Sequence, residues 1–272
     1  MNRATPRAGG FTLVELLVVV AIVGMLLAIL MPTIAKARRA AQASTCLSNL
    51  RGWAQAVATY TTEHRGRYWI DYGNYPPPGS GQGTWMRTLA AYYRNLDRFR
   101  LCPSADQPTG TWGSPTFGAW GPIGSPGSLL DPNDYGSYGV NCWMNDLPAT
   151  GPFVLGWRLR PDLQWRRVGG HRGKPSEAPI IGDCEWYGGN PMDYASGLTY
   201  GRPAIVENAL YRQTYGWPNM WYYDMARFAM NRHGRGIQMA FEDGSARYVE
   251  KTELWRLHWY RGFRPANVNL PY

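Results

Sequence analysis

The longest pattern in the chain is an almost unbroken run of apolar side chains close to the N-terminus. It covers residues 11–31, FTLVELLVVVAIVGMLLAILM, in which Glu15 is the only charged residue. As an α-helix this run extends about 30 Å, which is the thickness of the hydrocarbon core of a bilayer. Basic residues lie on both sides of it, so flanking charge does not decide its orientation. The pattern predicts a helix that can span a membrane.

A second helical pattern follows the apolar run. Apolar residues recur there at spacings of three and four, which is typical of one face of an amphipathic helix. The residues of this face are Leu47, Leu50, Ala54 and Val57. We expect the helix to continue to about His64, with Gly66 as its stop signal, and to lay this face on a globular head.

The C-terminal part of the chain predicts a β-hairpin. Residues 236–241, GIQMAF, and 246–249, ARYV, are strand-like, and Asp243-Gly244 lies between them. Glycine accepts the positive φ that such turns need. Short helices are expected at Thr84–Leu96 and around Lys251–Tyr260.

Glycine, proline and aromatic residues become dense from Arg65 onward. Residues 75–85 and 109–128 are the clearest examples, and they predict long loops. The second loop either packs on the body of the head or stays exposed, and the side chains that favour packing are Trp112, Phe117 and Trp120. The expected fold is α+β: a long N-terminal helix, transmembrane and then amphipathic, packed on a small antiparallel sheet with long aromatic, glycine- and proline-rich loops.

Three interpretations of the apolar run compete. An ordinary transmembrane anchor fits its length, but the ionised Glu15 is costly in a helix that faces lipid and calls for a partner. A secretory signal peptide cut after Ala37 fits the small-x-small pattern of residues 35–37. That interpretation needs a shorter hydrophobic region without an acid.

The third interpretation rests on residues 9–16, GGFTLVEL. This segment resembles the processing motif of type IV pilins and type II secretion pseudopilins. The resemblance implies that a prepilin peptidase of the inner membrane cuts between Gly10 and Phe11 and methylates the new amine of Phe11. Such a cut removes the short basic leader and leaves the whole apolar helix attached.

The residues of this motif also make physical sense. Glycine at position 10 can extend into a protease active site. After the cut, Glu15 lies about one helical turn from the amine of Phe11, and in a staggered filament it can neutralise the amine of a neighbouring subunit. Pro32 falls where many pilins also have proline. It removes one backbone donor and kinks the helix, or it simply ends a transmembrane helix.

Motifs of the head extend the resemblance. His233, nine residues and then Asp243-Gly244 resemble the C-terminal H-x9-DG pattern of a large prepilin-like family, as do residues 46–51, 102–104 and 137–141. No role is assigned to His233, Asp243 and Gly244. A catalytic pair of His233 and Asp243 is the enzymatic alternative, which we disfavour because such residues more often bond to backbone. No catalytic motif is visible elsewhere, so the chain is expected not to be an enzyme.

The four cysteines show no CxxC pair and no histidine at metal-ligand spacing. We therefore expect no metal site of zinc type. In a head outside the cytoplasm two disulfides are the natural use of four cysteines, and three connectivities are open. Our preferred pairs are Cys46 with Cys102 and Cys142 with Cys184.

Cofactors are otherwise expected to be absent, with calcium as the one exception. Residues 131–136, DPNDYG, weakly resemble a calcium loop, although its twelfth position is Cys142 where glutamate is typical. Pseudopilin heads sometimes bind calcium. Asx-turn chemistry explains the same residues without an ion.

The charge of the chain bears on its partners. The formal net charge is +9, with 28 basic and 19 acidic residues, and all but three of the basic residues are arginine. Arginine stacks on aromatic rings, and 13 tryptophans and 18 tyrosines offer such partners within the chain. The alternative is an anionic partner such as DNA, an acidic polysaccharide or phospholipid headgroups.

Together these observations predict three parts: a leader at 1–10, an assembly helix at 11–65 and a pseudopilin-like head at 66–272. The expected function is a structural subunit of a type IV pilus-like or type II secretion pseudopilus filament. Its partners are other pilins or pseudopilins and the prepilin peptidase. It starts as a single-pass inner-membrane protein with a periplasmic head and ends in an extracytoplasmic or cell-surface filament. The alternative is a minor or tip subunit, or an anchored binding protein, whose Arg/Trp-rich head recognises a secreted substrate, polysaccharide or DNA.

Overall fold

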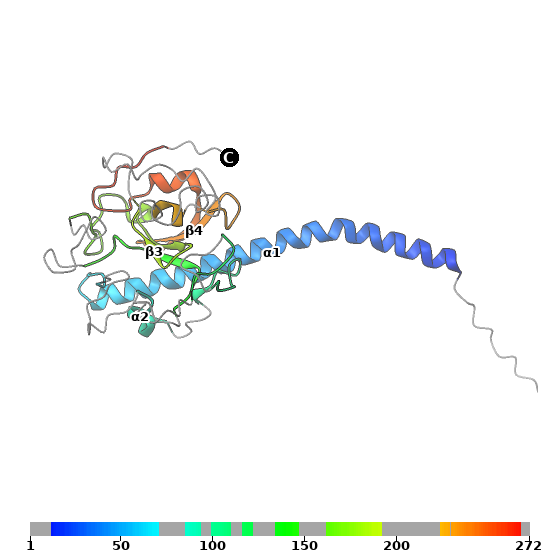
Figure 1. The fold of residues 1–272 in the computed structure, drawn as a ribbon, viewed down its shortest axis with the longest axis horizontal. Helices are drawn as coiled ribbons and strands as arrows, with labels where there is room; N and C mark the ends of the chain where they lie inside the picture. The colour runs from blue at the N-terminus through cyan, green and yellow to red at the C-terminus, as the bar shows by residue number, and fades with distance from the viewer. Residues whose placement is uncertain are drawn as a thin grey trace, which may run out of the picture. The chain divides into compact units, whose positions relative to one another are not determined.

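A computed structural model describes the chain at residues 12–70, 85–93, 99–109, 116–121, 134–146, 162–191, 224–228 and 230–267. The chain divides into two compact units between Ala41 and Gln42. One long helix, α1 (Leu13–Glu63), contributes to both units (Figure 1). The remaining described elements are short strands and helical turns, so the expected α+β class is confirmed.

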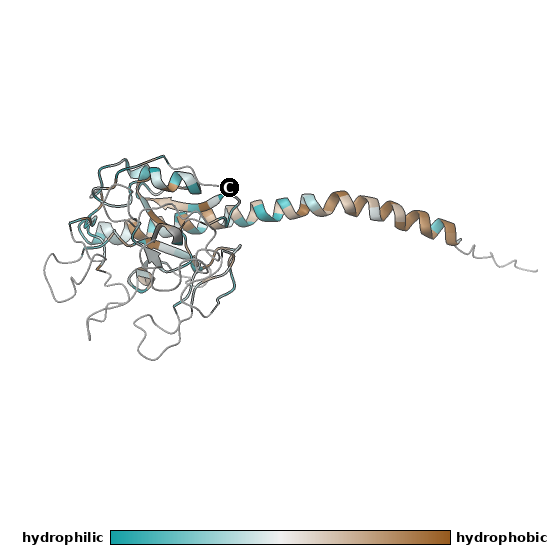
Figure 2. Ribbon diagram, turned by 45° about the horizontal axis from the view of Figure 1, so that its top comes forward, coloured by the Kyte–Doolittle hydropathy of each residue, from teal (hydrophilic) through white to brown (hydrophobic). Residues whose placement is uncertain are grey.

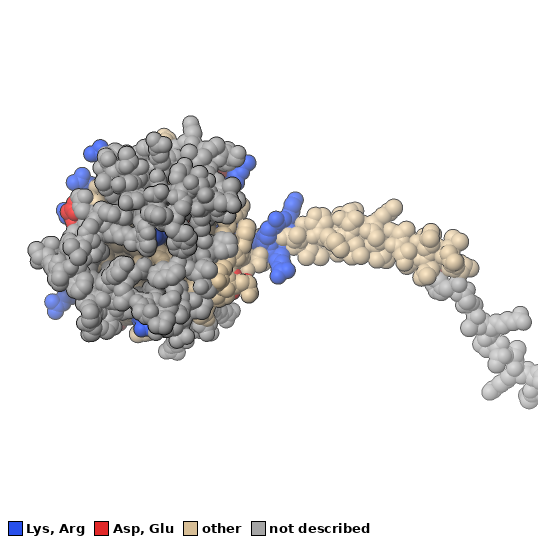
Figure 3. Space-filling model, viewed as in Figure 1, with Lys and Arg blue, Asp and Glu red and all other residues tan. Residues whose placement is uncertain are grey.

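The first unit consists, as far as it is described, of α1 up to Ala41. Its large apolar side chains from Leu13 to Ile34 are each exposed by 44% to 80%. They cover all sides of the helix (Figure 2), and Lys36, Arg38 and Arg39 follow as an exposed basic band (Figure 3). A helix that is apolar all round needs a membrane or other helices around it. Among the described residues, α1 is the one helix long and apolar enough to cross a membrane.

Helix α1 continues through Pro32. The hydroxyl of Thr33 donates a hydrogen bond of 2.7 Å to the carbonyl of Leu30, and α-helical geometry extends on both sides. Proline has no N–H to donate to the carbonyl four residues earlier, so one helical bond is missing at this point. The interpretation that Pro32 merely ends the helix is wrong.

The end of α1 lies where the sequence predicts it. Arg65 and Gly66 have left-handed backbones, with φ of 56° and 77°, and the Gly66 amide donates to the carbonyl of Thr61 at 2.7 Å. This reversal closes the helix and supplies a donor for one of its last carbonyls.

The second half of α1 buries one face in the head. The predicted Leu50, Ala54 and Val57 are buried, and Leu47 is half-buried against the same core. The full set of buried α1 residues is Cys46, Asn49, Leu50, Trp53, Ala54, Ala56, Val57 and Thr61. The amphipathic pattern therefore identified the packing face correctly.

The head contains a five-stranded sheet in the order β3-β1-β2-β4-β5. The strands are β1 (Tyr138–Asn141), β2 (Pro179–Asp183), β3 (Gly188–Gly189), β4 (Gly236–Phe241) and β5 (Ala246–Glu250). All neighbours are antiparallel except β1 and β3, which are parallel. The sheet is thus mixed and not purely antiparallel as expected, because the chain reverses after β2 and runs beside β1 in the direction of β1.

The predicted hairpin is confirmed as β4 and β5. Ala240 pairs with Ala246, and Gly244 in the turn has a φ of 84°. The carboxylate of Asp243 accepts hydrogen bonds from the amide and the hydroxyl of Ser245 at 2.9 and 2.6 Å. These bonds form a local Asx turn.

The expected helix at Thr84–Leu96 is wrong as a continuous element. Its described part forms one α-helical turn, α2 (Trp85–Thr88), and a 3-10 turn, η1 (Ala90–Tyr92), after which Tyr93 is extended. The rings of Trp85 and Tyr93 both pack edge-on against Trp53, with centroids 4.9 and 4.4 Å away. Tertiary packing on one ring therefore overrides the helical pattern.

The other helical turns in the described ranges are of the 3-10 type. They are η2 (Pro175–Glu177), η4 (Asp224–Arg227) and η5 (Lys251–Arg256). The last of these confirms a short helix in the predicted Lys251–Tyr260 region, although it is shorter and tighter than expected.

Aromatic residues supply much of the core. Every tryptophan that the structure describes is buried, and the set is Trp53, Trp69, Trp85, Trp120, Trp143, Trp165, Trp186, Trp255 and Trp259. Trp120 anchors its loop segment in the core, while Phe117 is 62% exposed and Trp112 lies outside the described residues. The tryptophan-rich composition therefore serves folding in this part of the chain.

Candidate functional site

The N-terminal site centres on the start of α1. Thr12 and Glu15 cap the helix reciprocally: the Thr12 amide and hydroxyl both donate to Glu15 Oε2 at 2.8 Å, and the Glu15 amide donates to the Thr12 hydroxyl at 3.3 Å. This is a capping box of the T-x-x-E type. The sequence analysis missed it, although the spacing of Thr12 and Glu15 is its signature. The predicted cleavage residues Gly10 and Phe11 lie outside the described residues.

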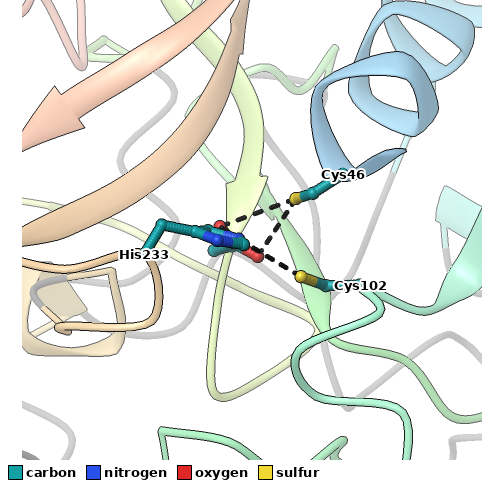
Figure 4. Close-up of side chains that lie close together, drawn as sticks. Cys46, Cys102 and His233 are labelled. Carbon is teal, nitrogen blue, oxygen red and sulfur yellow. Dashed lines mark hydrogen bonds and ion pairs between the residues drawn. The ribbon is translucent and has the colours of Figure 1, made fainter. Parts of the chain in front are cut away.

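The second site is a group of four buried side chains, Cys46, Cys102, Asp183 and His233, which we call the buried thiol cluster. One ligand-type atom from each side chain lies within 4.8 Å of the others. Figure 4 shows the two sulfurs and the imidazole converging from the helix and from two separate loops. Cys46 and Asp183 are 137 residues apart in the chain, and Cys102 and His233 are 131 apart.

The distances within the buried thiol cluster are short. Cys46 Sγ lies 3.7 Å from Asp183 Oδ1, and Cys102 Sγ lies 3.3 Å from His233 Nε2. His233 Nε2 is also 3.3 Å from Asp183 Oδ2. The side chains of His233 and Asp183 are 5% and 0% exposed, so water has little access.

Each member of the cluster is positioned by a different element. Cys46 is the first buried residue of α1, and Asp183 ends β2 opposite Tyr138 of β1. The Cys102 amide donates to the hydroxyl of Ser137, just before β1. His233 precedes β4 in a turn closed by its own amide on the carbonyl of Gly236 at 3.0 Å.

A fully buried arginine stands beside the cluster. Arg232 donates to Asp183 Oδ1 at 3.1 Å and to four backbone carbonyls, those of Thr116, Gly118, Ser137 and Cys184. A guanidinium has five N–H donors, and here five acceptors surround it. The sequence analysis missed both Arg232 and Asp183. The available signals were Asp183, directly after the strand-like residues 179–182, and Arg232, directly before His233.

These neighbours shift the ionisation of the cluster. Burial opposes the charge of Asp183, yet Arg232 and His233 hold its pKa below the usual value. Burial also works against protonated His233, but Asp183 and Cys102 raise its pKa to about 9. Burial raises the pKa of Cys46 well above the usual value. The pKa of Cys102 falls to about 7, because hydrogen bonds with Cys46 and His233 outweigh burial.

Further hydrogen bonds hold the ligand-type atoms in place. The Tyr138 hydroxyl donates to Cys46 Sγ at 3.4 Å, and the side-chain amide of Asn49 donates to that hydroxyl at 3.4 Å. The Gln238 amide donates to Asp183 Oδ2 at 2.8 Å. The cluster is thus a preorganised set of sulfur, nitrogen and oxygen atoms that can hold a metal or join two thiols.

Comparison with known proteins concerns the N-terminal site. Residues 5–31 match the family described as the prokaryotic N-terminal methylation motif. The match includes the leader's end, the predicted cut and the apolar run, and it supports a type IV pilin-like protein that prepilin peptidase processes. No curated protein and no solved structure matches the chain. The H-x9-DG resemblance therefore remains a sequence observation.

The structure bears on two expectations about the cysteines. No histidine has metal-ligand spacing to a cysteine along the sequence, but folding brings His233 Nε2 to 3.3 Å from Cys102 Sγ. The preferred pair of Cys142 with Cys184 is wrong. The Cys184 amide donates to the carbonyl of Ser137, and Cys184 Sγ lies against Gly139. Cys142 is three residues beyond Gly139, about 10 Å along the strand direction, which is more than a disulfide spans.

The other preferred pair, Cys46 with Cys102, consists of residues that lie close together. Their sulfurs are neighbours in the buried thiol cluster, and all four cysteines are thiols in the structure. This pairing stays a prediction.

His233 and Asp243 do not form the imagined catalytic pair. His233 points into the buried thiol cluster, whereas Asp243 bonds to Ser245 in the hairpin turn. The six residues of β4 lie between them and extend about 20 Å. The two ends of the H-x9-DG pattern therefore have separate structural roles, a cluster residue and a turn.

The candidate calcium loop is described only in part. Asp131 and Asn133 lie outside the described residues, while Asp134 is buried and faces Arg87 and Arg100 at 3.8 and 4.0 Å. Two guanidinium groups compete with a cation for this carboxylate. Calcium binding there stays an untested prediction.

A further acid lies inside the H-x9-DG pattern. Glu242 Oε1 accepts hydrogen bonds from the Tyr68 hydroxyl at 2.7 Å and from the Gly169 amide at 2.9 Å, and Oε2 lies 2.7 Å from His171 Nε2. Burial opposes its ionisation, but the bonds from His171, Tyr68 and Gly169 hold its pKa below the usual value. Glu242 thus ties the start of the hairpin turn to two other segments of the head.

Proposed function

We propose that this chain is a structural subunit of a filament of the type IV pilus or type II secretion pseudopilus kind. The observation that carries the proposal is the match of residues 5–31 to the methylation motif, joined to a helix whose apolar side chains are exposed on all sides. In the inner membrane lipid covers these side chains. In the filament the same surface packs against the helices of neighbouring subunits.

Glu15 supplies the register in this proposal. Within one chain its carboxylate caps the start of α1 through Thr12. Once the leader is removed, the amine of Phe11 adds a positive charge at this end of the helix. A carboxylate and an amine from adjacent subunits neutralise each other, and both are then spared an unpaired charge in an apolar environment.

N-terminal peptide mass spectrometry on protein from its native membrane tests the processing step. A mature chain that begins at methylated Phe11 is expected, and Gly10→Asp should retain the leader. A chain that begins at Arg38 after a signal-peptide cut, or still at Met1, would overturn the proposal.

The filament step needs its own measurement. Sheared surface fractions or membrane extracts are examined for assembled protein by electron microscopy and by cross-linking through cysteines placed in α1. Filaments or α1-to-α1 cross-links are expected for the processed chain and not for Gly10→Asp. A processed chain that stays monomeric in the presence of its assembly machinery would contradict a structural role.

The binding-head alternative has weaker support. It relied on a surface rich in arginine and tryptophan, but every described tryptophan lies in the core. Binding of DNA by the head would weaken steeply as salt rises. Salt-dependent binding of DNA or an acidic polysaccharide to the purified chain would revive this alternative.

A further inference from the structure

We propose that the buried thiol cluster binds one zinc ion through Cys46, Cys102, Asp183 and His233. The site is separate from the N-terminal segment that carries the proposed function, and it concerns how the head is held together. Its four side chains offer two sulfurs, one carboxylate oxygen and one imidazole nitrogen within 4.8 Å of one another. Zinc accepts all three of these ligand types.

The spacing of the ligand atoms fits a tetrahedron. With Zn–S of about 2.3 Å and Zn–N or Zn–O of about 2.0–2.1 Å, the edges of a tetrahedral site are about 3.3–3.8 Å. The distances are 3.3 Å from Cys102 Sγ to His233 Nε2, 3.3 Å from His233 Nε2 to Asp183 Oδ2, and 3.8 Å from Asp183 Oδ2 to Cys46 Sγ. Three of the six edges are therefore already close to the lengths of a tetrahedral zinc site, and the other three are no longer than 4.8 Å.

The charges also balance around an ion. Two thiolates and one carboxylate bring three negative charges, zinc brings two positive charges, and the buried guanidinium of Arg232 brings the remaining positive charge. Arg232 reaches the cluster through Asp183 Oδ1 and directs its other donors to backbone carbonyls, which leaves Oδ2 on the side of His233. Metal binding releases the protons of the two thiols.

The surroundings resemble the outer shell of a structural metal site. Ligand atoms in such sites are oriented by further hydrogen bonds. Here the Tyr138 hydroxyl donates to Cys46 Sγ, and both Arg232 and the Gln238 amide donate to Asp183. Because the protein supplies four ligands and the cluster is buried, the site is closed, which is typical of structural zinc and not of catalytic zinc.

Such an ion would join four separate segments of the head. It links α1 at its first buried residue to the loop at Cys102, the end of β2 and the approach to β4. The ion also gives His233, the first residue of the H-x9-DG pattern, a structural role. Asp243 and Gly244, at the other end of the pattern, form the hairpin turn. A disulfide between Cys46 and Cys102 is the competing use of the same thiols, and it would leave His233 and Asp183 without a metal.

The test is the zinc content of the full-length chain, extracted in detergent from its native membrane and measured by elemental mass spectrometry. About one zinc per chain is expected. Cys102→Ser should lower the zinc content at least tenfold. Cys142→Ser is the matched control, because Cys142 lies outside the cluster, and it should keep the ion. Tyr138→Phe, which removes only the hydroxyl that donates to Cys46, should weaken zinc affinity about 10- to 100-fold.

Two measurements on the unaltered chain keep the test decisive if Cys102→Ser does not fold. A chelator should release zinc and at the same time expose Cys46 and Cys102 to a thiol reagent. Replacement of zinc by Co²⁺ should produce the absorption bands of sulfur-to-cobalt charge transfer. A chain without zinc whose thiols react freely, a Cys46–Cys102 disulfide in native material, or full zinc content in folded Cys102→Ser would overturn the proposal. None of these results depends on whether the chain assembles into filaments.

Discussion

At the scale of single residues, three acidic side chains each accept local hydrogen bonds and also carry a negative charge. Glu15 caps its own helix and is proposed to neutralise a neighbour's amine. Glu242 joins the hairpin turn to Tyr68 and His171, and Asp183 joins the thiol cluster to Arg232. In each case the local bond and the charge can be separated by replacing the acid with its amide.

Glu15 allows the sharpest separation. Glutamine can replace glutamate in a capping box, whereas alanine cannot. We expect both Glu15→Gln and Glu15→Ala to insert into the membrane and to impair filament assembly, because both lack the charge. Cross-linking between α1 helices measures assembly, and membrane fractionation controls for insertion. Normal filaments from Glu15→Gln would refute charge pairing and leave capping as the role of Glu15.

Glu242 predicts a pH dependence of head stability. Its pKa is lowered from the ordinary 4.5 in the folded state, so the ionised form stabilises the fold. This contribution is complete above about pH 4.5 and is lost as the pH falls through the lower folded-state pKa. Glu242→Gln should therefore be less stable than the parent chain near neutral pH, with a difference that shrinks in acid. Thermal unfolding from pH 3 to 7 measures it, and a constant difference over that range would contradict the prediction.

At the scale of elements, backbone conformation explains how α1 ends and tertiary packing explains why a predicted helix breaks. Arg65 and Gly66 are left-handed and stop α1, as glycine at this position predicts. The predicted Thr84–Leu96 helix instead breaks into two turns, because Trp85 and Tyr93 pack on the same ring of Trp53.

Two adjacent substitutions at the end of α1 should change the stability by different amounts. Gly66 has a φ of 77° and open space around its Cβ position, so Gly66→Ala costs only conformational strain, about 1 kcal/mol of unfolding free energy. Arg65 already carries that strain at a φ of 56°. Arg65→Gly should change stability by less than about 0.5 kcal/mol, since relief of strain offsets the extra entropy of the unfolded chain. Denaturant unfolding of both variants measures the contrast; equal losses would contradict it.

At the scale of the whole molecule, the chain combines a unit that needs an apolar environment with a unit that has its own core. The described core residues all belong to the unit Gln42–Tyr272, whereas the large apolar residues of the first unit are exposed. This division fits the proposed filament subunit, in which lipid covers the apolar helix before assembly and the head folds around its own core.

A truncated chain tests that division. Residues 42–272 retain Cys46 and the whole buried face of α1. We expect this fragment to fold, to remain soluble and monomeric, and to sediment apart from membranes, while the full chain partitions into them. Size-exclusion chromatography and circular dichroism measure the result. An unfolded or aggregated fragment would show that the first unit contributes to the stability of the head.

The sequence alone determined the features that depend on neighbours along the chain. The apolar run, the face of α1, its stop at Gly66 and the Asp243-Gly244 turn all follow from periodicity or from the backbone preference of one residue, and each is confirmed. The processing motif is likewise local, and the family match supports it. The capping box was within reach of the same reasoning, because Thr12 and Glu15 lie three residues apart.

Only the tertiary structure decided what distant residues do together. Cys46, Cys102, Asp183 and His233 have no common spacing in the chain, and they meet because α1 packs against a sheet whose second strand ends at Asp183 and whose fourth begins after His233. The same sheet separates Cys142 from Cys184 and His233 from Asp243. Periodicity reports the environment of one element at a time, whereas a site built from four segments depends on the strand order and on the register between strands, which no local pattern encodes.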